Sequence, residues 1–229
     1  MRRPGVVAAA CALALAAASS ASAQIAARRE GPRAGSWEAG GGVVWSGSFT
    51  GPRRTAELTE NGESSGGFDL FTAIGEISSG AGLGVTLGYY LSRSLAVEAG
   101  LRFSKPRLSF RLTGDIEDAG AITADETLTR YVFTGSLVFH LRDTSQGRRL
   151  IPFVSGGAGY IRDLHEGAEL VETGTEYHVT GGIKYWLGRG ARRFGLRGEA
   201  GVSITDGGFE FRDGTRTLPV AAGSVVYVF

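Results

Sequence analysis

The sequence is poor in cysteine, in net charge and in long hydrophobic runs. Cys11 is the one cysteine among 229 residues. It lies in a segment expected to be removed, so the mature chain offers no disulfide, thiolate zinc site or cysteine nucleophile. The 24 Lys and Arg residues nearly balance the 23 Asp and Glu residues, which gives no support for nucleic-acid binding. After the N-terminal segment, no hydrophobic run approaches the roughly 20 residues of a transmembrane helix.

Hydrophobic residues are nevertheless abundant, at 42% of the chain. They are distributed along it, and only helices and closed barrels satisfy their backbone groups in lipid. Short strands with alternating residues are therefore the expected signature of a membrane protein here. The 37 glycines agree with this prediction, because glycine is poor in helices and common at barrel bends and close strand contacts.

The N-terminus has the pattern of a secretory signal peptide. Arg2 and Arg3 supply the charged region, residues 6–18 form a short apolar run, and Ala21 and Ala23 flank the small-residue cleavage site. The apolar run is shorter than the roughly 20 residues of a membrane anchor. We therefore expect a signal peptide at residues 1–23, a flexible periplasmic leader at 24–36 and a single domain at 37–229.

The clearest strand pair is a hairpin between residues 83 and 103. Apolar residues alternate along 83–91 and again along 95–103, with a three-residue turn between them. This turn predicts that Leu87 pairs with Ala99, so that both apolar sets lie on one surface. A second hairpin, with Leu187 opposite Phe194, aligns its faces in the same way.

Alternation with a period of two predicts eight strands. The expected strands lie at 37–49, 83–91, 95–103, 131–141, 150–162, 177–187, 194–204 and in the segment that ends at 229. Long loops are expected at 50–67, 114–126, 164–176 and 206–217, and short turns at 92–94, 142–149 and 188–193. This regular change of loop length is typical of small outer-membrane barrels, with short periplasmic turns and long extracellular loops.

Two stretches stay open at this point, and one changes its pattern. Residues 68–79 fit a helix as well as a strand, and they either extend a strand above the membrane or pack over the barrel mouth. The glycines in 150–162 hide which face of that strand points outward. After Phe103, Lys105 and Pro106 interrupt the alternation, which resumes on the other parity as it does after a bulge.

Three segments resemble a known family: Leu95–Leu101, Phe153–Tyr160 and Val225–Phe229. They are similar to segments of the small outer-membrane β-barrels of the OmpA-like and OmpX-like superfamily. The resemblance implies an all-β, eight-stranded, antiparallel, up-and-down transmembrane barrel in the outer membrane, surrounded by lipid and monomeric. It also implies that Val225, Tyr227 and Phe229 form the C-terminal signal read by the barrel-assembly machinery. The terminal signal of the family usually has a glycine on the strand face opposite to that of the last aromatic residue. In this chain Ser224 stands on that face, and the nearby glycine, Gly223, is on the other.

If the apolar sets face lipid, a cluster of charged residues faces the barrel interior. Its members are Glu38, Glu98, Arg102, Arg130, Lys184, Arg197 and Glu199. Charges of both signs can neutralise one another there, and a barrel of eight strands is just wide enough for side chains to fill it. Two interpretations follow, a structural polar plug and a gated pore whose ion pairs open and close.

The expected function is a non-catalytic one, a structural or surface-interaction role through the extracellular loops. The alternatives are a narrow gated pore, a lipid-A-modifying barrel enzyme and a soluble lipocalin-like lipid carrier. Of the three histidines, His140, His165 and His178, only His178 lies where an enzyme would need it, near Ser203. We expect no catalytic residue, cofactor, metal or nucleic-acid partner, and the sequence names no extracellular ligand.

Overall fold

The computed structural model describes residues 32–58, 68–113, 121–142, 149–165, 170–187, 194–207 and 215–229. Within these ranges no helix is long and apolar enough to cross a membrane. The expected signal peptide, with Ala21 and Ala23, and most of the expected leader lie outside the described residues, so both stay predictions.

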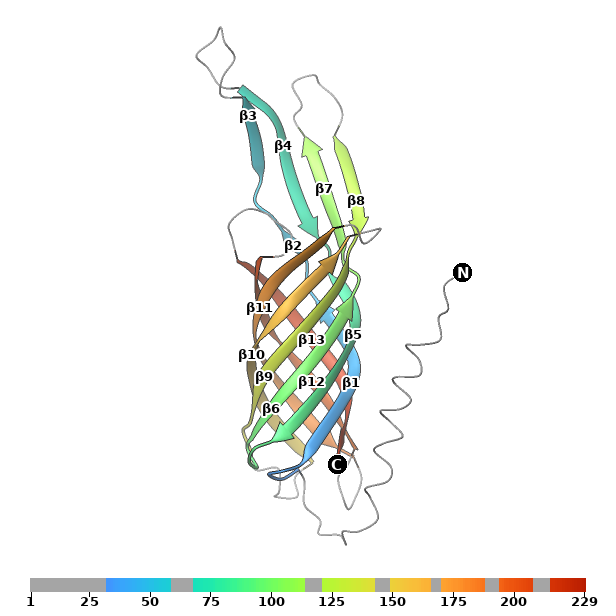
Figure 1. Ribbon diagram of the computed structural model, residues 1–229, viewed down its shortest axis with the longest axis vertical. Coiled ribbons are helices and arrows are strands. Elements are labelled where there is room, and N and C mark those ends of the chain that lie inside the picture. The colour runs from blue at the N-terminus through green and yellow to red at the C-terminus, as the bar shows by residue number, and fades with distance from the viewer. Residues whose placement is uncertain are drawn as a thin grey trace, which may run out of the picture.

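Eight strands close into a barrel in which every neighbouring pair is antiparallel (Figure 1). They are β1 (Trp37–Ser46), β5 (Gly80–Tyr90), β6 (Leu95–Ser104), β9 (Thr129–His140), β10 (Leu150–Leu164), β11 (Val171–Trp186), β12 (Phe194–Gly207) and β13 (Arg216–Val228). The order around the barrel is β1-β13-β12-β11-β10-β9-β6-β5, and β1 closes it by pairing with both β13 and β5. The predicted fold class is confirmed.

The registers predicted for the hairpins are confirmed as well. Leu87 lies opposite Ala99 in the β5–β6 pair, and the backbone N–H of Leu187 donates to the carbonyl of Phe194 at 2.9 Å. For β10, pairing with β9 settles the outward face that the glycines had hidden. Ala158 lies opposite Gly135, so Val154, Gly156, Ala158 and Tyr160 face outward and Phe153 faces the interior.

Five further strands form a second sheet beyond one end of the barrel (Figure 1). They are β2 (Phe49–Thr50), β3 (Arg54–Leu58), β4 (Phe68–Ile77), β7 (Arg107–Thr113) and β8 (Ile122–Thr127). The order is β2-β4-β7-β8, and β3 pairs with the outer part of β4. The open stretch at 68–79 is therefore mainly strand.

Several expected boundaries were wrong. Residues 54–58 and 122–127 were assigned to loops but are strands, because polar residues such as Thr, Arg and Glu carry no apolar alternation where a sheet lies in water. The expected first strand is interrupted after Ser46. The loops at 164–176 and 206–217 are shorter than expected, since β11 begins at Val171 and β13 at Arg216.

The change of parity after Phe103 marks the point where the chain leaves the barrel. β6 pairs with β9 as far as Ser104, and after Pro106 the chain continues as β7, which pairs with β4 and β8 instead. Proline has no N–H to donate to a neighbouring strand, so it suits this break. At the base of the second sheet Ile77, Leu108 and Leu128 pack together, each at most 2% exposed.

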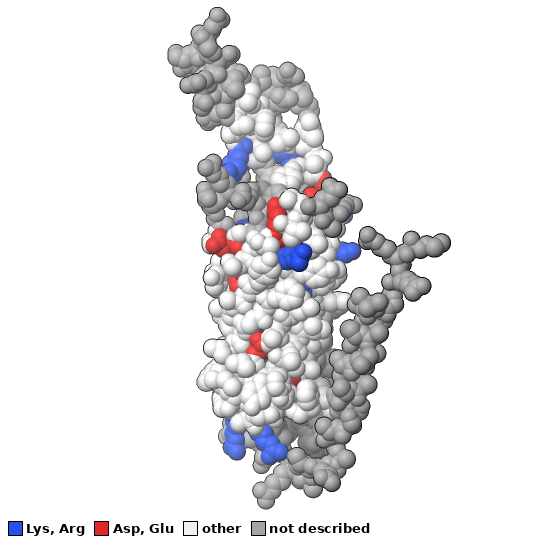
Figure 2. Space-filling view, in the orientation of Figure 1, with Lys and Arg blue, Asp and Glu red and all other residues white. Residues whose placement is uncertain are grey.

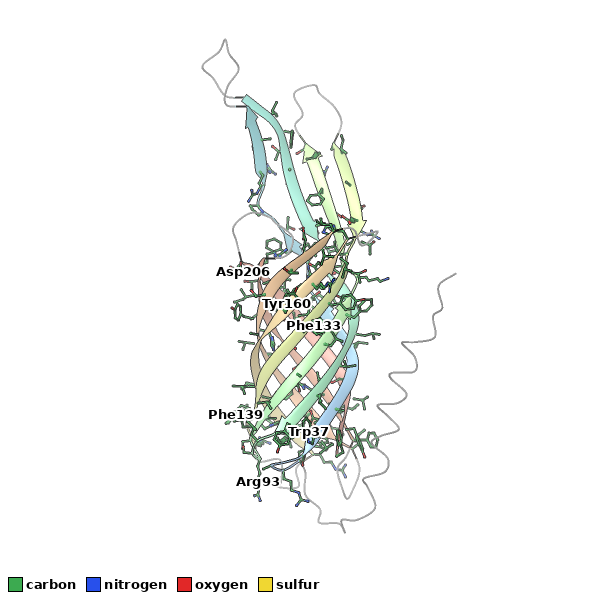
Figure 3. The ribbon with its side chains drawn as sticks, in the orientation of Figure 1. Trp37, Arg93, Phe133, Phe139, Tyr160 and Asp206 are labelled. Carbon is green, nitrogen blue, oxygen red and sulfur yellow. The ribbon has the colours of Figure 1, made fainter. Side chains whose placement is uncertain are left out.

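The outer wall of the barrel is apolar between two levels of aromatic residues. Outward side chains such as Leu83 and Val179 are 63% and 64% exposed, as expected of groups that face lipid. Figure 3 places Trp37 and Phe139 near one end of this band and Phe133 and Tyr160 near the other. The β5–β6 turn, the start of β1 and the end of β13 share the Trp37 end (Figure 1), which makes it the periplasmic end; the second sheet is extracellular.

An arginine placed in the middle of this band tests the assignment of faces. Val85→Arg should destabilise the barrel by roughly 2–4 kcal/mol, because it places a cation near the bilayer midplane, whereas Ala81→Arg near the extracellular interface should cost roughly 0–1 kcal/mol. Urea unfolding in lipid vesicles, followed by the gel mobility of unboiled samples, measures both variants. Equal costs at the two depths would contradict the membrane band.

Candidate functional site in the barrel lumen

The seven charged residues singled out in the sequence all lie on inward-facing strand positions. Glu38 comes from β1, Glu98 and Arg102 from β6, Arg130 from β9, Lys184 from β11, and Arg197 and Glu199 from β12. The structure distributes them over three levels along the barrel axis. Each level pairs cations with carboxylates, as a narrow interior requires.

The level nearest the periplasm is a compact trio of buried polar groups. Lys184 Nζ lies 2.7 and 2.9 Å from the two carboxylate oxygens of Glu38, and each side chain is 2% exposed. The Tyr90 hydroxyl donates to Glu38 Oε2 at 2.7 Å, while Lys184 Nζ donates to the Tyr90 oxygen at 3.2 Å. Three strands, β1, β5 and β11, are tied together at this point.

The middle level is centred on Arg197. Its guanidinium donates to Glu98 and, at 2.9 Å, to Glu199 Oε2. Glu199 Oε2 also accepts a hydrogen bond from Thr180 at 3.2 Å. The guanidinium carbon lies 4.7 Å from the ring centre of Phe153, a distance that favours a cation–π interaction.

The extracellular level contains two ion pairs whose acidic partners the sequence analysis missed. Arg102 binds Glu176, and Arg130 binds Asp163 in a bidentate pair at 2.8 and 2.7 Å. The sequence analysis assigned Glu176 to a loop. It lies two residues before His178, however, and alternate residues of a strand share a face, so an extended strand would have placed Glu176 in the lumen as well. Asp163 lies one residue beyond the strand expected at 150–162, and only the register opposite Arg130 identifies it.

A polar cavity of about 90 Å³ adjoins the middle level, lined by residues that include Ser136, His178, Thr180 and Arg197. A cavity of this size can hold several water molecules. On the periplasmic side the lumen narrows to buried apolar groups. They are Tyr90, Ala96, Val138, Phe153, Ile151, Trp186, Val226 and Val228, each at most 8% exposed. These groups lie around the Lys184–Glu38–Tyr90 trio, and together they fill the lumen between the cavity and the periplasmic end.

His178 lies between a serine, to which it is hydrogen-bonded, and a more distant carboxylate. Its register partner is Ser203, as the sequence suggested, but the hydrogen bond of His178 Nε2 is to Ser136 Oγ, at 3.0 Å. Its Nδ1 lies 3.7 Å from Glu176 Oε1, beyond hydrogen-bond range. Glu176 is already bound to Arg102, so the geometry favours an interior network over an activated nucleophile.

The other two histidines lie at opposite ends of the barrel. His140 is 1% exposed at the periplasmic end and stacks on Tyr90, with ring centres 5.3 Å apart. His165 lies at the extracellular rim. Within the described ranges, no group of three or more His, Cys, Asp or Glu residues is arranged to hold a metal ion.

The fold is similar to that of solved outer-membrane proteins. The outer membrane protein OprG from Pseudomonas aeruginosa aligns with a TM-score of 0.53 and 13% identity, over 87% of this chain and 98% of its own. This chain folds as a small outer-membrane β-barrel. Neisserial surface protein A aligns with a TM-score of 0.47 and 10% identity (85% and 97% of the two chains). Ail, the attachment invasion locus protein of Yersinia pestis, aligns at 0.45 and 12% (86% and 99%). No protein-family model and no curated protein sequence matches the chain.

The barrel's own surface is consistent with a location in the outer membrane. Its outward strand positions are apolar through the central band, and few charged atoms interrupt the middle of the view in Figure 2. Within this band the charged residues of the same strands face the lumen, where they are paired, and exposed charges such as Arg162 and Asp206 lie near the extracellular ends of the strands. Lipid therefore surrounds the barrel between its two aromatic levels.

At the extracellular rim, His165 bridges the second sheet and the barrel. His165 Nδ1 lies 2.9 Å from Glu126 Oε1 of β8, and Nε2 lies 3.6 Å from Glu172 Oε2 of β11. Partial burial opposes protonation, but the hydrogen bond to Glu126 and the charges of Glu126 and Glu172 outweigh it. The pKa of His165 is therefore raised above its usual 6.5.

Removal of the Lys184–Glu38 pair tests how far the barrel depends on it. Lys184→Met leaves a buried carboxylate without its cation, so we expect a loss of about 3–5 kcal/mol in unfolding free energy. Adding Glu38→Gln to the same chain should restore most of this loss, because no uncompensated charge then remains. Urea unfolding in lipid vesicles measures both variants, and a double variant as unstable as Lys184→Met would contradict the explanation.

The His165 bridge predicts a pH-dependent rim. Because the pKa of His165 is raised on folding, its stabilising contribution is complete below about 6.5 and is lost as pH rises through the folded pKa. Backbone hydrogen exchange of β8, divided at each pH by that of His165→Gln, should show protection that decreases with rising pH. A ratio that stays constant from pH 5.5 to 9 would refute the bridge.

Proposed function

We propose that the protein is a non-catalytic outer-membrane barrel that binds an extracellular partner through the sheet outside the membrane. The observation that carries this proposal is the pair of free sheet edges. Among the described strands, β3 pairs only with β4 and β8 only with β7. An unpaired strand edge presents a row of N–H and C=O groups to which an extended segment of another chain can add.

The hydrogen bonds around β8 show which of its groups face the free edge. Leu128 N–H donates to the Pro106 carbonyl at 3.0 Å, so groups of the same parity point toward β7. In an antiparallel strand the alternate residues point the other way. The N–H groups of Thr123, Asp125 and Thr127 therefore face the free edge, and β8 contains neither the lysine nor the proline that commonly protects such an edge.

One face of the second sheet adds an apolar surface beside this edge. Leu112 lies opposite Ala73 on one side and Ile122 on the other. Phe71, Leu112 and Ile122 are 39%, 36% and 59% exposed, although this part of the sheet lies above the membrane. A partner strand that joined β8 could place alternate apolar side chains against them.

The lumen gives less support to the two transmembrane alternatives. A pore would need a continuous water path, whereas buried apolar side chains such as Phe153 and Trp186, at 1% and 0% exposed, close the periplasmic side. A barrel enzyme would need an activated nucleophile. The nearest arrangement, Ser136 with His178, ends on a carboxylate that is 3.7 Å away.

The proposal also covers assembly and oligomeric state. We propose that the barrel is a monomer and that the assembly machinery reads its last strand. Val225, Tyr227 and Phe229 share the outward face of the β13 end, and Val225 and Phe229 are 53% and 52% exposed. Tyr227 packs on Phe194 with ring centres 4.7 Å apart, which stabilises the closing strands.

A proline at the free edge tests the binding proposal. Peptides are first selected from a displayed library against the full-length protein in lipid nanodiscs, and they should be rich in extended, β-branched sequences. Asp125→Pro removes one edge N–H without removing a bond to β7, so it should weaken these peptides at least tenfold. Ala124→Pro is the matched comparison. It also places a proline in β8, but the N–H that it removes faces β7 and not the free edge.

A barrel without the second sheet supplies the second control. Ser46 lies opposite Gly80 and Ser104 opposite Arg130, so short turns can join these ends in place of residues 47–79 and 105–129. The trimmed barrel should still migrate faster when unboiled but bind none of the peptides. Peptide binding that survives both Asp125→Pro and trimming would overturn the proposed function.

A further inference from the structure

The middle level of the lumen contains more negative groups than positive ones. Its cation is Arg197, which donates to two carboxylates, Glu98 and Glu199. The levels on either side are balanced, because each of their ion pairs joins one cation to one carboxylate. The middle level therefore retains one negative charge, which is costly inside a narrow lumen unless something else neutralises it.

The two carboxylates of this level are only partly engaged. Both line the polar cavity of about 90 Å³. Arg197 donates to Oε2 of each carboxylate, and Oε2 of Glu199 also accepts a hydrogen bond from Thr180. In the described part of the chain no donor reaches Oε1 of Glu98 or of Glu199. Two carboxylate oxygens are therefore left for a ligand of the cavity.

Three hydroxyl groups complete the oxygen lining of the cavity, those of Thr86, Thr134 and Ser155. A Cβ added at Gly40 would lie 2.5 Å from Thr86 Oγ1, and one added at Gly100 would lie 2.6 Å from Thr134 Oγ1. The two glycines therefore leave the space that these hydroxyls occupy. Ser155 is 5% exposed, and none of the three hydroxyls has a hydrogen-bond partner among the described residues. Buried hydroxyls without a partner in the protein call for a bound group.

The charge and the ligand atoms together narrow the kind of group that fits. Water satisfies the hydroxyls but leaves the negative charge in place. Carboxylate oxygens suit hard cations. A divalent ion would reverse the sign of the charge, and calcium takes roughly 6–8 oxygen ligands. The described ranges also contain no group of three or more His, Cys, Asp or Glu residues arranged to hold a metal ion. One singly charged cation balances the level.

We propose that the cavity binds one monovalent alkali cation, which acts as the counterion of the middle level. Oε1 of Glu98 and Oε1 of Glu199 are its charged ligands. The hydroxyls of Thr86, Thr134 and Ser155 supply the remaining protein oxygens. The cation replaces in charge what a second arginine would otherwise supply, and it satisfies hydroxyls that no arginine could satisfy, because a guanidinium is a donor without an acceptor.

A protonated His178 would be a competing source of positive charge. Its Nε2 is hydrogen-bonded to Ser136 Oγ at 3.0 Å, and its Nδ1 lies 3.7 Å from Glu176 Oε1. Its charge would therefore fall next to a carboxylate that is already paired with an arginine. The two unbonded carboxylate oxygens would remain without a partner.

A second cavity, of about 40 Å³, connects this site with the extracellular side. Arg102 lines both cavities, and its side chain is 25% exposed, so a cation that enters from outside passes Arg102. Ser203 lines the second cavity and not the first. It is 2% exposed, and its hydroxyl also has no hydrogen-bond partner among the described residues. Ser203 therefore offers a control for Ser155.

The first test compares the stability of the full-length protein in chloride salts of different cations. The protein is folded in phosphatidylcholine vesicles, which carry no net charge, at about pH 8, where an ordinary histidine is neutral. Urea unfolding should have a higher midpoint in sodium or potassium chloride than in N-methylglucammonium chloride of the same ionic strength, because the bulky cation cannot enter the cavity. The increase should saturate as expected for one site. Equal midpoints in all three salts would overturn the proposal.

Variants of the lumen test whether the effect comes from this site. Glu199→Gln leaves Arg197 with one carboxylate, so the level is neutral and the difference between the salts should disappear. Asp206→Asn, the same change of charge at an exposed position, should keep the full difference. Ser155→Ala should raise the half-saturating sodium concentration about fivefold, the effect of one lost polar contact, and Ser203→Ala should leave it unchanged. A salt difference that survives Glu199→Gln would overturn the proposal.

Thallium locates the cation directly. Tl⁺ substitutes for alkali cations and scatters anomalously, so crystals of the full-length protein grown with thallium acetate should show a peak bounded by Glu98, Glu199 and Ser155. Crystals of Glu199→Gln should lack it. Heat-dependent gel mobility confirms that each variant is folded. Stabilisation by sodium without a thallium peak in the cavity would place the cation elsewhere and would contradict the proposed site.

Discussion

The structure depends on one constraint: within a bilayer, each backbone N–H and C=O group needs a partner from the protein itself. β1 meets this constraint by pairing with β13 on one side and β5 on the other, which leaves no edge inside the lipid band. Closure with eight strands then produces a narrow lumen. Because that lumen has little room for water, its charged residues must neutralise one another, and the Lys184–Glu38 and Arg130–Asp163 pairs do so within direct contact.

The constraint ends at the extracellular aromatic level, and the architecture changes there. Above that level water can satisfy the backbone, so strands no longer need to close. After Lys105 and Pro106 the chain leaves β6 as β7 and joins an open sheet whose outermost described strands are β3 and β8. Alternation of apolar and polar residues along a strand therefore has a different meaning inside the membrane and outside it. Inside the membrane it separates lipid from lumen, and in β7, outside the membrane, it separates the apolar Leu108, Phe110 and Leu112 from the polar Arg107, Ser109 and Arg111.

The sequence alone predicted the strand faces and hairpin registers that depend on the contrast between lipid outside the barrel and polar groups inside it. The Leu87–Ala99 register could be found because apolar and polar residues alternate along both strands. The outward face of β10 could not be predicted in the same way. Gly156 and Gly157 place the same residue type on opposite faces, so the two faces do not differ in polarity there. The strand at 122–127 was missed because its residues lie in water on both faces. Ion pairs such as Arg102–Glu176 join residues distant in sequence, and only the three-dimensional register brings them together.

The two ends of the barrel differ in a way that follows from their surroundings. Carboxylates of the extracellular rim, such as Glu126 and Glu172, are engaged with His165, whereas the described periplasmic rim exposes arginines and no acidic side chain. Buried side chains, among them Phe153 and the Lys184–Glu38 pair, lie between the cavity of the middle level and the periplasmic end. The two rims can therefore differ in chemistry although they belong to the same eight strands.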